Sequence, residues 1–245
     1  MIPTAAVGPM LDVASRAPEV TLDELAPGGT VLVVSPHPDD ETLGCGTAIA
    51  AAADAGLTVL VLLLTDGEGS HRNSPSVSEG ALRRMRRGEL DAALTILTGG
   101  RELPVLRLGL PDGHSAVDLI EGDCFDALLR TFRRHDVRSV WTTWAGDPHI
   151  DHRTAATLAR DLARLLRVDF WSYPVWGRFS NEPFETPNLR RFVCPDDEFA
   201  DRKRRALSVY RTQFDAAIDD DPDGFIMPPP LLEHFATFDE IFIRG

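Results

Sequence analysis

Residues 31–41 read Val-Leu-Val-Val-Ser-Pro-His-Pro-Asp-Asp-Glu. The aliphatic run predicts a buried strand of a parallel sheet, because helices cover both faces of such strands. His37 and the three acids after Pro38 then lie at the carboxyl end of this strand, the edge at which open α/β sheets bind their ligands. An imidazole packed with three carboxylates is unfavourable unless a cation or protons relieve the repulsion. The alternative is an ordinary helix start, since acids in a first turn suit the positive end of a helix.

A second polar cluster follows another predicted strand, residues 139–144. Residues 145–152 read Ala-Gly-Asp-Pro-His-Ile-Asp-His, so two histidines three positions apart enclose an aspartate. This grouping is typical of metal ligands, although a polar loop with capping histidines has the same composition. Because both clusters follow strands of one predicted sheet, we expect them to form a shared metal site.

Strands and helices alternate along the chain. The patterns predict strands at residues 30–35, 57–64, 105–108, 139–143 and 168–173, and helices between them at residues 43–55, 78–97, 117–135 and 154–166. Strands separated by helices form parallel βαβ units. The predicted fold class is therefore α/β, with a mostly parallel sheet flanked by helices.

The length of 245 residues fits one such domain. We expect a single domain over residues 1–245, in which residues 1–28 are an N-terminal extension. Toward the C-terminus the alternation weakens, and proline and charged residues become frequent. Residues 174–245 are predicted to be an irregular region on the substrate side, with a helix at 197–210 and an apolar end at 238–243 that packs as a lid or edge.

The two polar motifs resemble those of the LmbE/PIG-L family of zinc-dependent N-deacetylases. They are His-Pro-Asp-Asp-Glu at residues 37–41 and Pro-His-Ile-Asp-His at residues 148–152. Supporting segments that also look like the family lie at residues 65–68, 108–113 and 210–213. The resemblance implies a Rossmann-like fold and a hydrolase that removes an N-acetyl or N-acyl group from an amino sugar of the N-acetylglucosamine type, in a small molecule or a glycoconjugate.

Residue by residue, the resemblance implies that His37, Asp40 and His152 are the metal ligands. Two imidazoles and one carboxylate around Zn²⁺ leave a position open for water, which is the usual catalytic arrangement. We therefore expect one Zn²⁺, or another divalent metal, per chain. Asp39 is expected to act as general base for the water and to pass the proton to the departing amine.

Supporting roles fall to further residues. His149, if protonated, is expected to stabilise the tetrahedral oxyanion, and Asp151 to orient or tune His149. Arg86 forms an Arg-x-x-Glu pair with Glu89, as in family members, and is a candidate to bind substrate. His71, in a loop rich in polar residues, is a second candidate for binding sugar hydroxyls.

Two other functions stay open for the same residues. A metal-dependent esterase or phosphoesterase would use the same scaffold, although phosphate chemistry commonly employs two metals or more carboxylates. A non-catalytic sugar-binding relative is disfavoured, because the proposed base and all three ligands are present. A dinucleotide site is disfavoured too, because the G-x-G-x-x-G pattern that starts at Gly44 has Ile49 in place of its third glycine. We expect Gly44 and Gly46 to let the first helix pack closely on the sheet instead.

Composition limits the partners and the location. A net charge of −13 disfavours nucleic acid, which calls for a basic surface. No apolar run approaches the roughly 20 residues of a membrane span, so no membrane partner is expected. The three cysteines are odd in number and widely spaced, which argues against a disulfide framework. Without a recognisable signal peptide, these features predict a cytoplasmic protein acting on a small molecule, and a homo-oligomer stays possible.

Overall fold

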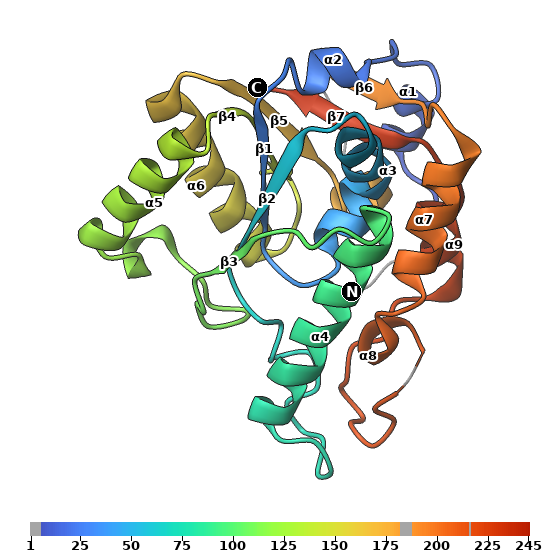
Figure 1. The fold of residues 1–245 in the computed structure, drawn as a ribbon. Coiled ribbons are helices and arrows are strands. Elements are labelled where there is room, and N and C mark those ends of the chain that lie inside the picture. Colours follow the sequence, from blue (N-terminus) through green and yellow to red (C-terminus); the bar gives the residue numbers. More distant parts are fainter. Residues whose placement is uncertain (1–5, 182–187, 216) are drawn as a thin grey trace.

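The computed structural model describes residues 6–181, 188–215 and 217–245 (Figure 1). Within these ranges one sheet has the strand order β3-β2-β1-β4-β5-β7-β6. The strands are β1 (Thr30–Ser35), β2 (Thr58–Leu63), β3 (Val105–Arg107), β4 (Val137–Thr143), β5 (Asp169–Tyr173), β6 (Leu189–Phe192) and β7 (Glu240–Arg244). Strands β1 to β5 pair in parallel, whereas β7 is antiparallel to both β5 and β6. The predicted α/β fold with a mostly parallel sheet is confirmed.

Helices cover both faces of the sheet. They are α1 (Pro9–Ala14), α2 (Leu22–Leu25), α3 (Asp40–Asp54), α4 (Glu79–Leu97), α5 (Gly122–Arg134), α6 (Ile150–Leu166), α7 (Asp197–Leu207), α8 (Arg211–Phe214) and α9 (Pro229–Thr237), with short 3₁₀ turns η1 (Val117–Leu119) and η2 (Gly177–Phe179). Figure 1 shows α5 and α6 on one side of the sheet and α3, α4 and α7 on the other. None of the helices in the described ranges is both long enough and apolar enough to span a bilayer.

Strand β1 is buried along its whole length because its alternating side chains enter two separate cores. Val31 and Val33 pack in the cluster that contains α3 and α4, whereas Leu32 and Val34 pack in the cluster with α5 and α6. Since successive side chains of a strand point to opposite faces, a continuous aliphatic run is what a strand covered on both faces requires.

The strand order places both polar motifs beside the reversal point at which open α/β sheets bind their ligands. β1 has β2 on one side and β4 on the other, so the chain direction across the sheet reverses between β1 and β4. At such a reversal the loops leaving the carboxyl ends of the two strands diverge and leave a crevice. The loop after β1 leads into α3 and the loop after β4 leads into α6, so both motifs border this crevice.

The C-terminal region is more regular than its sequence suggests. Its described residues form η2, β6, β7 and three helices, and the helix expected at residues 197–210 is α7, followed by α8. The prediction of a lid or edge at residues 238–243 was wrong, because this segment supplies β7, an inner strand between β5 and β6. Ile241 and Phe242 are fully buried there. Their short apolar run does not by itself reveal an antiparallel partner far away in the sequence.

Candidate metal centre

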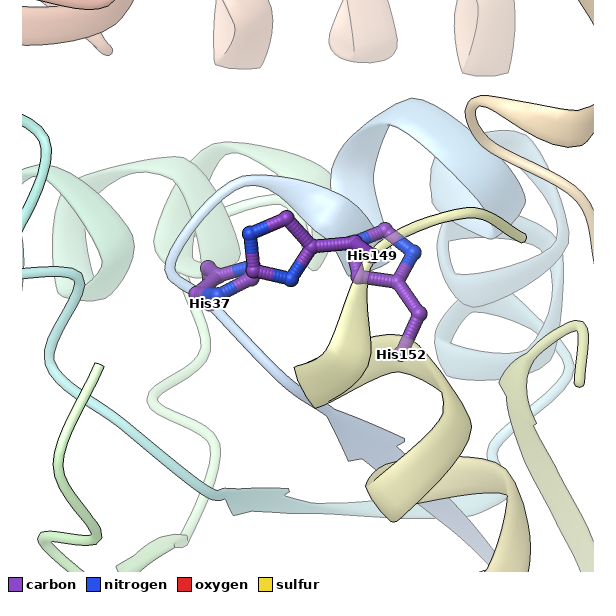
Figure 2. Close-up of side chains that lie close together, drawn as sticks. All are labelled: His37, His149 and His152. Atoms are coloured by element: carbon purple, nitrogen blue, oxygen red, sulfur yellow. The ribbon is translucent and has the colours of Figure 1, made fainter. Parts of the chain in front are cut away.

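Three imidazoles meet at the crevice. His37 lies in the loop after β1, His149 is the N-cap of α6 and His152 lies in its first turn. Figure 2 shows the three rings close together, with His37 coming from the loop after β1 and His149 and His152 from the start of α6. The ring centroids are 4.8 Å apart for His37 and His149, 5.5 Å for His37 and His152, and 5.3 Å for His149 and His152. The two motifs therefore form one site.

Asp40 lies between the two histidines predicted to share a metal with it. Its Oδ2 is 2.9 Å from Nδ1 of His37 and 3.4 Å from Nε2 of His152. Ligand atoms about 2.0–2.1 Å from a tetrahedral Zn²⁺ lie about 3.3 Å from one another, so these separations suit a shared ion. Nε2 of His152 is also buried and has no hydrogen-bond partner within the described ranges. Buried polar atoms are rarely left in that state, and a cation would satisfy this one.

The carboxylate of Asp147 fixes the ring of His152. Its Oδ2 lies 2.7 Å from Nδ1 of His152 and also accepts the backbone N–H of Val175 at 3.0 Å. Its Oδ1 accepts the N–H of Gly177 at 2.7 Å. An ionised carboxylate only accepts, so Nδ1 of His152 carries the proton and Nε2 offers its lone pair to an ion. Asp147 was not among the predicted site residues, although an aspartate two positions before His149 was a usable signal.

Asp151 supports His37 with its side chain and His149 with its backbone. Its Oδ2 lies 2.9 Å from Nε2 of His37 and 3.9 Å from Nδ1 of His149. Its backbone N–H donates to Nδ1 of His149 at 3.3 Å. Oδ1 accepts from the backbone and the hydroxyl of Ser115, at 3.0 and 2.7 Å. Asp151 thus contacts His149 at hydrogen-bond distance through its main chain, and through its carboxylate only at 3.9 Å.

Asp112 is a second carboxylate beside Nε2 of His37, at 3.2 Å, and it was not among the predicted site residues. The signal was its place in the Leu-Gly-Leu-Pro-Asp-Gly segment. His37, Asp112 and Asp151 also have the spacing of a metal-ligand group. An ion there would require a deprotonated Nε2 in addition to a ligating Nδ1, which neutral imidazole cannot provide. We therefore interpret the two carboxylates as groups that orient His37.

Asp39 and Arg86 form a buried pair beside the proposed ligand Asp40. Oδ2 of Asp39 accepts from Nη2 of Arg86 at 3.0 Å, and the same guanidinium donates to the carbonyls of Pro38 at 2.7 Å and Gly67 at 2.8 Å. Asp39 has a φ of 129°, a strained conformation of the kind that concentrates at functional sites. Arg86 is only 3% exposed, so the side chain predicted to bind substrate is directed at Asp39 and the backbone.

Gly67 is needed for this arrangement. Its φ is +68°, and a Cβ added there would lie 1.9 Å from Nη1 of Arg86. Burial raises the pKa of Asp39 well above its ordinary value, although the charge of Arg86 opposes that shift. The contact with Arg86 thus fixes the orientation of the Asp39 carboxylate, and burial makes this carboxylate hold a proton more readily than an exposed one.

The charge balance of the crevice also indicates a cation site. Burial alone would lower the pKa of His152, but Asp40 and Asp147 outweigh it and raise the value to about 9. Burial disfavours ionised Asp40 as well, yet His152 and His37 lower its pKa overall. Protonated imidazoles therefore balance the buried carboxylates, and a divalent cation would supply the same charge. Burial and the neighbouring imidazoles of His37 and His152 lower the pKa of His149 to about 4.

The last acid of the first motif, Glu41, holds the turn in place. Its carboxylate is buried and accepts from the hydroxyl of Tyr210 at 2.6 Å, from Ser35 at 3.2 Å and from the backbone of Asp39 at 3.3 Å. The segment at residues 210–213 thus contacts the first motif directly. On α4, Glu89 accepts from the hydroxyl of Thr212 in the same segment at 2.6 Å.

His71 lies beneath the C-terminal region instead of on an open rim. It is 2% exposed, and its Nδ1 lies 3.1 Å from the hydroxyl of Ser70, which also accepts from Gln213. A Cβ on Gly224 would lie 2.5 Å from the imidazole, so the loop backbone covers this side chain closely. Burial lowers the pKa of His71.

The chain is similar in sequence to a known protein family and to several named proteins. Residues 32–163, more than half of the chain, match the family model "PIG-L: GlcNAc-PI de-N-acetylase". A mycothiol S-conjugate amidase of Streptomyces coelicolor is 32% identical over 139 residues, which cover 50% of this chain and 47% of the relative. A diacetylchitobiose deacetylase of Thermococcus kodakarensis is 38% identical over 85 residues, which cover 31% of this chain and 32% of the relative.

Among solved structures, a conserved protein of Thermus thermophilus superposes with a TM-score of 0.60 at 27% identity, covering 87% of this chain and 93% of that one. The chain matches about half, or less, of the length of the curated relatives above. The family resemblance predicted from the two histidine motifs is confirmed, and so is its class of N-deacetylases and related amidohydrolases at the level of the family. The chain belongs to the PIG-L family of de-N-acetylases.

Proposed function

We propose that this chain is a zinc-dependent hydrolase that removes an N-acetyl or N-acyl group from an amino sugar of the N-acetylglucosamine type. The carrying observation is Nε2 of His152, which is buried, lacks a hydrogen-bond partner within the described ranges and lies 3.4 Å from Asp40. The names of the relatives, an amidase and a deacetylase of diacetylchitobiose, favour the same chemistry.

His37, Asp40 and His152 are the proposed ligands of one ion. The ligand set of two imidazoles and one carboxylate suits Zn²⁺ and leaves a position for water or substrate. When bound, Zn²⁺ supplies Lewis-acid chemistry, because it acidifies water and polarises an amide carbonyl. Asp147 and Asp151 each hold the distal nitrogen of one ligand imidazole, which fixes both rings before an ion arrives.

Asp39 is the proposed general base. It adjoins Asp40 in the chain, and its contact with Arg86 holds its carboxylate in one orientation. A carboxylate whose pKa is raised by burial is a better base near neutrality than an exposed one. Asp39 takes the proton of the attacking water and delivers it to the amine nitrogen as the C–N bond breaks.

His149 is the proposed donor to the oxyanion. The backbone N–H of Asp151 donates to its Nδ1, so a neutral His149 carries its own proton on Nε2. Because its pKa is lowered to about 4, the imidazole is neutral at physiological pH and still has an N–H to donate. The side chain is 39% exposed, which leaves it accessible to a substrate carbonyl.

Arg86 and His71 are buried, and we propose that they act on the substrate by positioning their neighbours. The single domain and the placement of residues 174–245 on the substrate side also stay proposals. They are supported by the contacts of Asp147 with Val175 and of Glu41 with Tyr210. A cytoplasmic location is proposed as well, because the three cysteines are unpaired and a reducing compartment keeps thiols in that state.

A substrate panel tests the proposal. The zinc-loaded protein is incubated with N-acylated glucosamine derivatives of several chain lengths, with matched acyl esters and with sugar phosphates. Amine release from the amides is expected, with little hydrolysis of the others. Preferential cleavage of the esters or phosphates would favour the alternative hydrolases. Saturable sugar binding without any turnover would favour a non-catalytic relative.

A further inference from the structure

Helix α3 is broken one turn after the proposed metal ligand that starts it. Cys45 has φ −143° and ψ 26°, far from helical values, although helical residues flank it on both sides. In an unbroken helix the N–H of Thr47 would bond to the carbonyl of Leu43, four residues earlier. The break therefore separates the first turn, Asp40 to Gly44, from the rest of the helix.

A buried ion pair from two other elements satisfies both sides of the break. The carboxylate of Glu240, on β7, accepts the backbone N–H groups of Thr47 at 2.7 Å and Ala48 at 3.0 Å. The ammonium of Lys203, on α7, donates to the freed carbonyl of Leu43 at 3.0 Å and to Glu240 at 2.7 Å. Glu240 thus caps the second segment of α3, and Lys203 holds the end of the first.

The glycines on either side of Cys45 make room for this arrangement. A Cβ on Gly44 would lie 2.0 Å from the ring of Tyr173, and one on Gly46 would lie 3.2 Å from Cγ of Lys203. The expectation that the glycines allow close packing therefore extends to α7 as well as the sheet. Figure 1 shows α3 between the sheet and α7, near β7.

Burial of this ion pair costs desolvation free energy, so a gain in stability alone does not explain it. Lys203 is 2% exposed and Glu240 is 1% exposed, so both charges have lost nearly all contact with water. Well-packed apolar residues often replace such a pair without loss of stability, whereas a charge pair can fix one arrangement of the backbone. Here its polar contacts join three elements at the point where the first turn of α3 needs support.

We infer that Lys203 and Glu240 are positioning residues for the catalytic centre: they set the orientation of the first turn of α3, and through it that of Asp39 and Asp40. The other end of this turn is held by the contact of Glu41 with Tyr210. The inference rests on the proposed function for its effect on catalysis. The orientation of the turn itself can be measured without any activity.

The test is the charge-neutral variant Lys203→Met/Glu240→Gln, which avoids leaving one buried charge alone. Gln has one acceptor oxygen where Glu240 uses two, so its NH2 group would face one of the N–H groups of Thr47 and Ala48. Met cannot donate to the carbonyl of Leu43. We expect Zn²⁺ affinity, measured by chelator competition, to fall about 10-fold or more, as for other groups that orient ligands. kcat should fall about 10-fold or more, with KM changed less than about 3-fold, because a small misplacement of reacting groups lowers the rate steeply.

Three further measurements keep the test decisive. Glu240→Asp retains the charge but is too short to reach both N–H groups, so it should show the same losses in smaller measure if the double variant does not fold. Lys203→Arg can still donate to Leu43 and Glu240, so it should keep most of the wild-type Zn²⁺ affinity and kcat. Phe132→Leu lowers stability on the opposite face of the sheet and should leave kcat unchanged.

Hydrogen exchange separates this inference from the proposed function. In chelator-treated protein the double variant should lose protection at the amides of residues 43–48, while α6 keeps its protection. That result would stand even if the wild-type protein hydrolysed no amide. Wild-type protection together with Zn²⁺ affinity and kcat within twofold of wild type would overturn the inference. So would an equal loss of kcat in Phe132→Leu.

Discussion

The carboxylate of Asp147 lies 2.7 Å from Nδ1 of His152, and this contact decides which nitrogen of the imidazole faces Asp40. With Nδ1 held as a donor, Nε2 is the buried nitrogen that can take an ion once its own proton is displaced. The same carboxylate accepts the backbone N–H groups of Val175 and Gly177. Asp147 therefore holds both the imidazole of His152 and the segment that follows β5. Groups of this kind commonly change metal affinity 10- to 100-fold when they are removed.

Asp147→Asn should therefore weaken Zn²⁺ binding about 10- to 100-fold while the protein stays folded. Its amide would have to face at least one of the N–H groups that the carboxylate now accepts. Competition with a chromophoric chelator measures the change. Asp201→Asn, on the exposed face of α7, is the control and should bind as wild type does. Unchanged affinity in Asp147→Asn would remove Asp147 from the support of the site.

Asp39→Asn should keep its metal and lose kcat by about 10²-fold or more, the usual scale for a general base. Asparagine is chosen because it tolerates a positive φ better than most residues, which limits damage at the strained backbone of Asp39. Steady-state kinetics and metal analysis on the same sample give both results. A variant that turns over at the wild-type rate would show that another group accepts the proton.

Asp40→Ala and His149→Ala together identify the third ligand. We expect Asp40→Ala to deplete Zn²⁺, because its Oδ2 lies within 3.4 Å of a nitrogen of each ligand histidine. His149→Ala should retain Zn²⁺ and lower kcat about 10- to 10³-fold, as expected for loss of one oxyanion donor. His37, His149 and His152 also have the spacing of a ligand group, so the opposite pattern is a real alternative. Metal loss only in His149→Ala would make His149, and not Asp40, the third ligand.

The free energy of unfolding of the chelator-treated protein should fall as the pH rises. The pKa of His152 is raised to about 9, so its protonated form favours the folded state. That contribution is complete below the unfolded value of about 6.5 and is lost as the pH rises through about 9, by up to about 3 kcal/mol. The pKa of His37 is raised too and acts in the same direction.

Urea unfolding between pH 6.5 and 9 measures this loss. Zn²⁺ affinity should rise over the same range, because the ion displaces protons from its ligands. Replacement of exposed His135 by Asn should leave the trend intact, whereas His152→Asn should reduce it. A flat stability profile in chelator-treated wild type would contradict the charge balance described for the crevice.

The parts of the fold carried by local patterns could be predicted from the sequence. The side chains from Val31 to Val34 alternate between two cores. A strand covered by helices on both faces needs such a continuous aliphatic run, so the sequence predicted a buried parallel strand. The meeting of the two motifs followed from the rule that parallel strands end at one edge of a sheet. Strand β7 could not be predicted, because its partners β5 and β6 are distant in sequence and antiparallel.

The roles of supporting groups depended on tertiary contacts that no local pattern contains. Asp112 reaches His37 from the loop after β3, and Arg86 reaches Asp39 from α4. The sequence suggested the residue types but not their partners, so Arg86 was assigned to the substrate. Asp151 was matched with its neighbour His149, whereas its carboxylate turns to His37 across the crevice. Spacing along one motif does not reveal which way a carboxylate faces.

The measurement closest to the central claim is amine release from an N-acetylglucosamine compound by one preparation before chelation, after chelation and after adding back one equivalent of Zn²⁺. We predict that activity disappears with the chelator, returns at about one Zn²⁺ per chain and does not return in His152→Ala. Undiminished amine release by the metal-depleted protein, or none from any N-acylated sugar by the zinc-loaded protein, would contradict a zinc-dependent deacylase at this site.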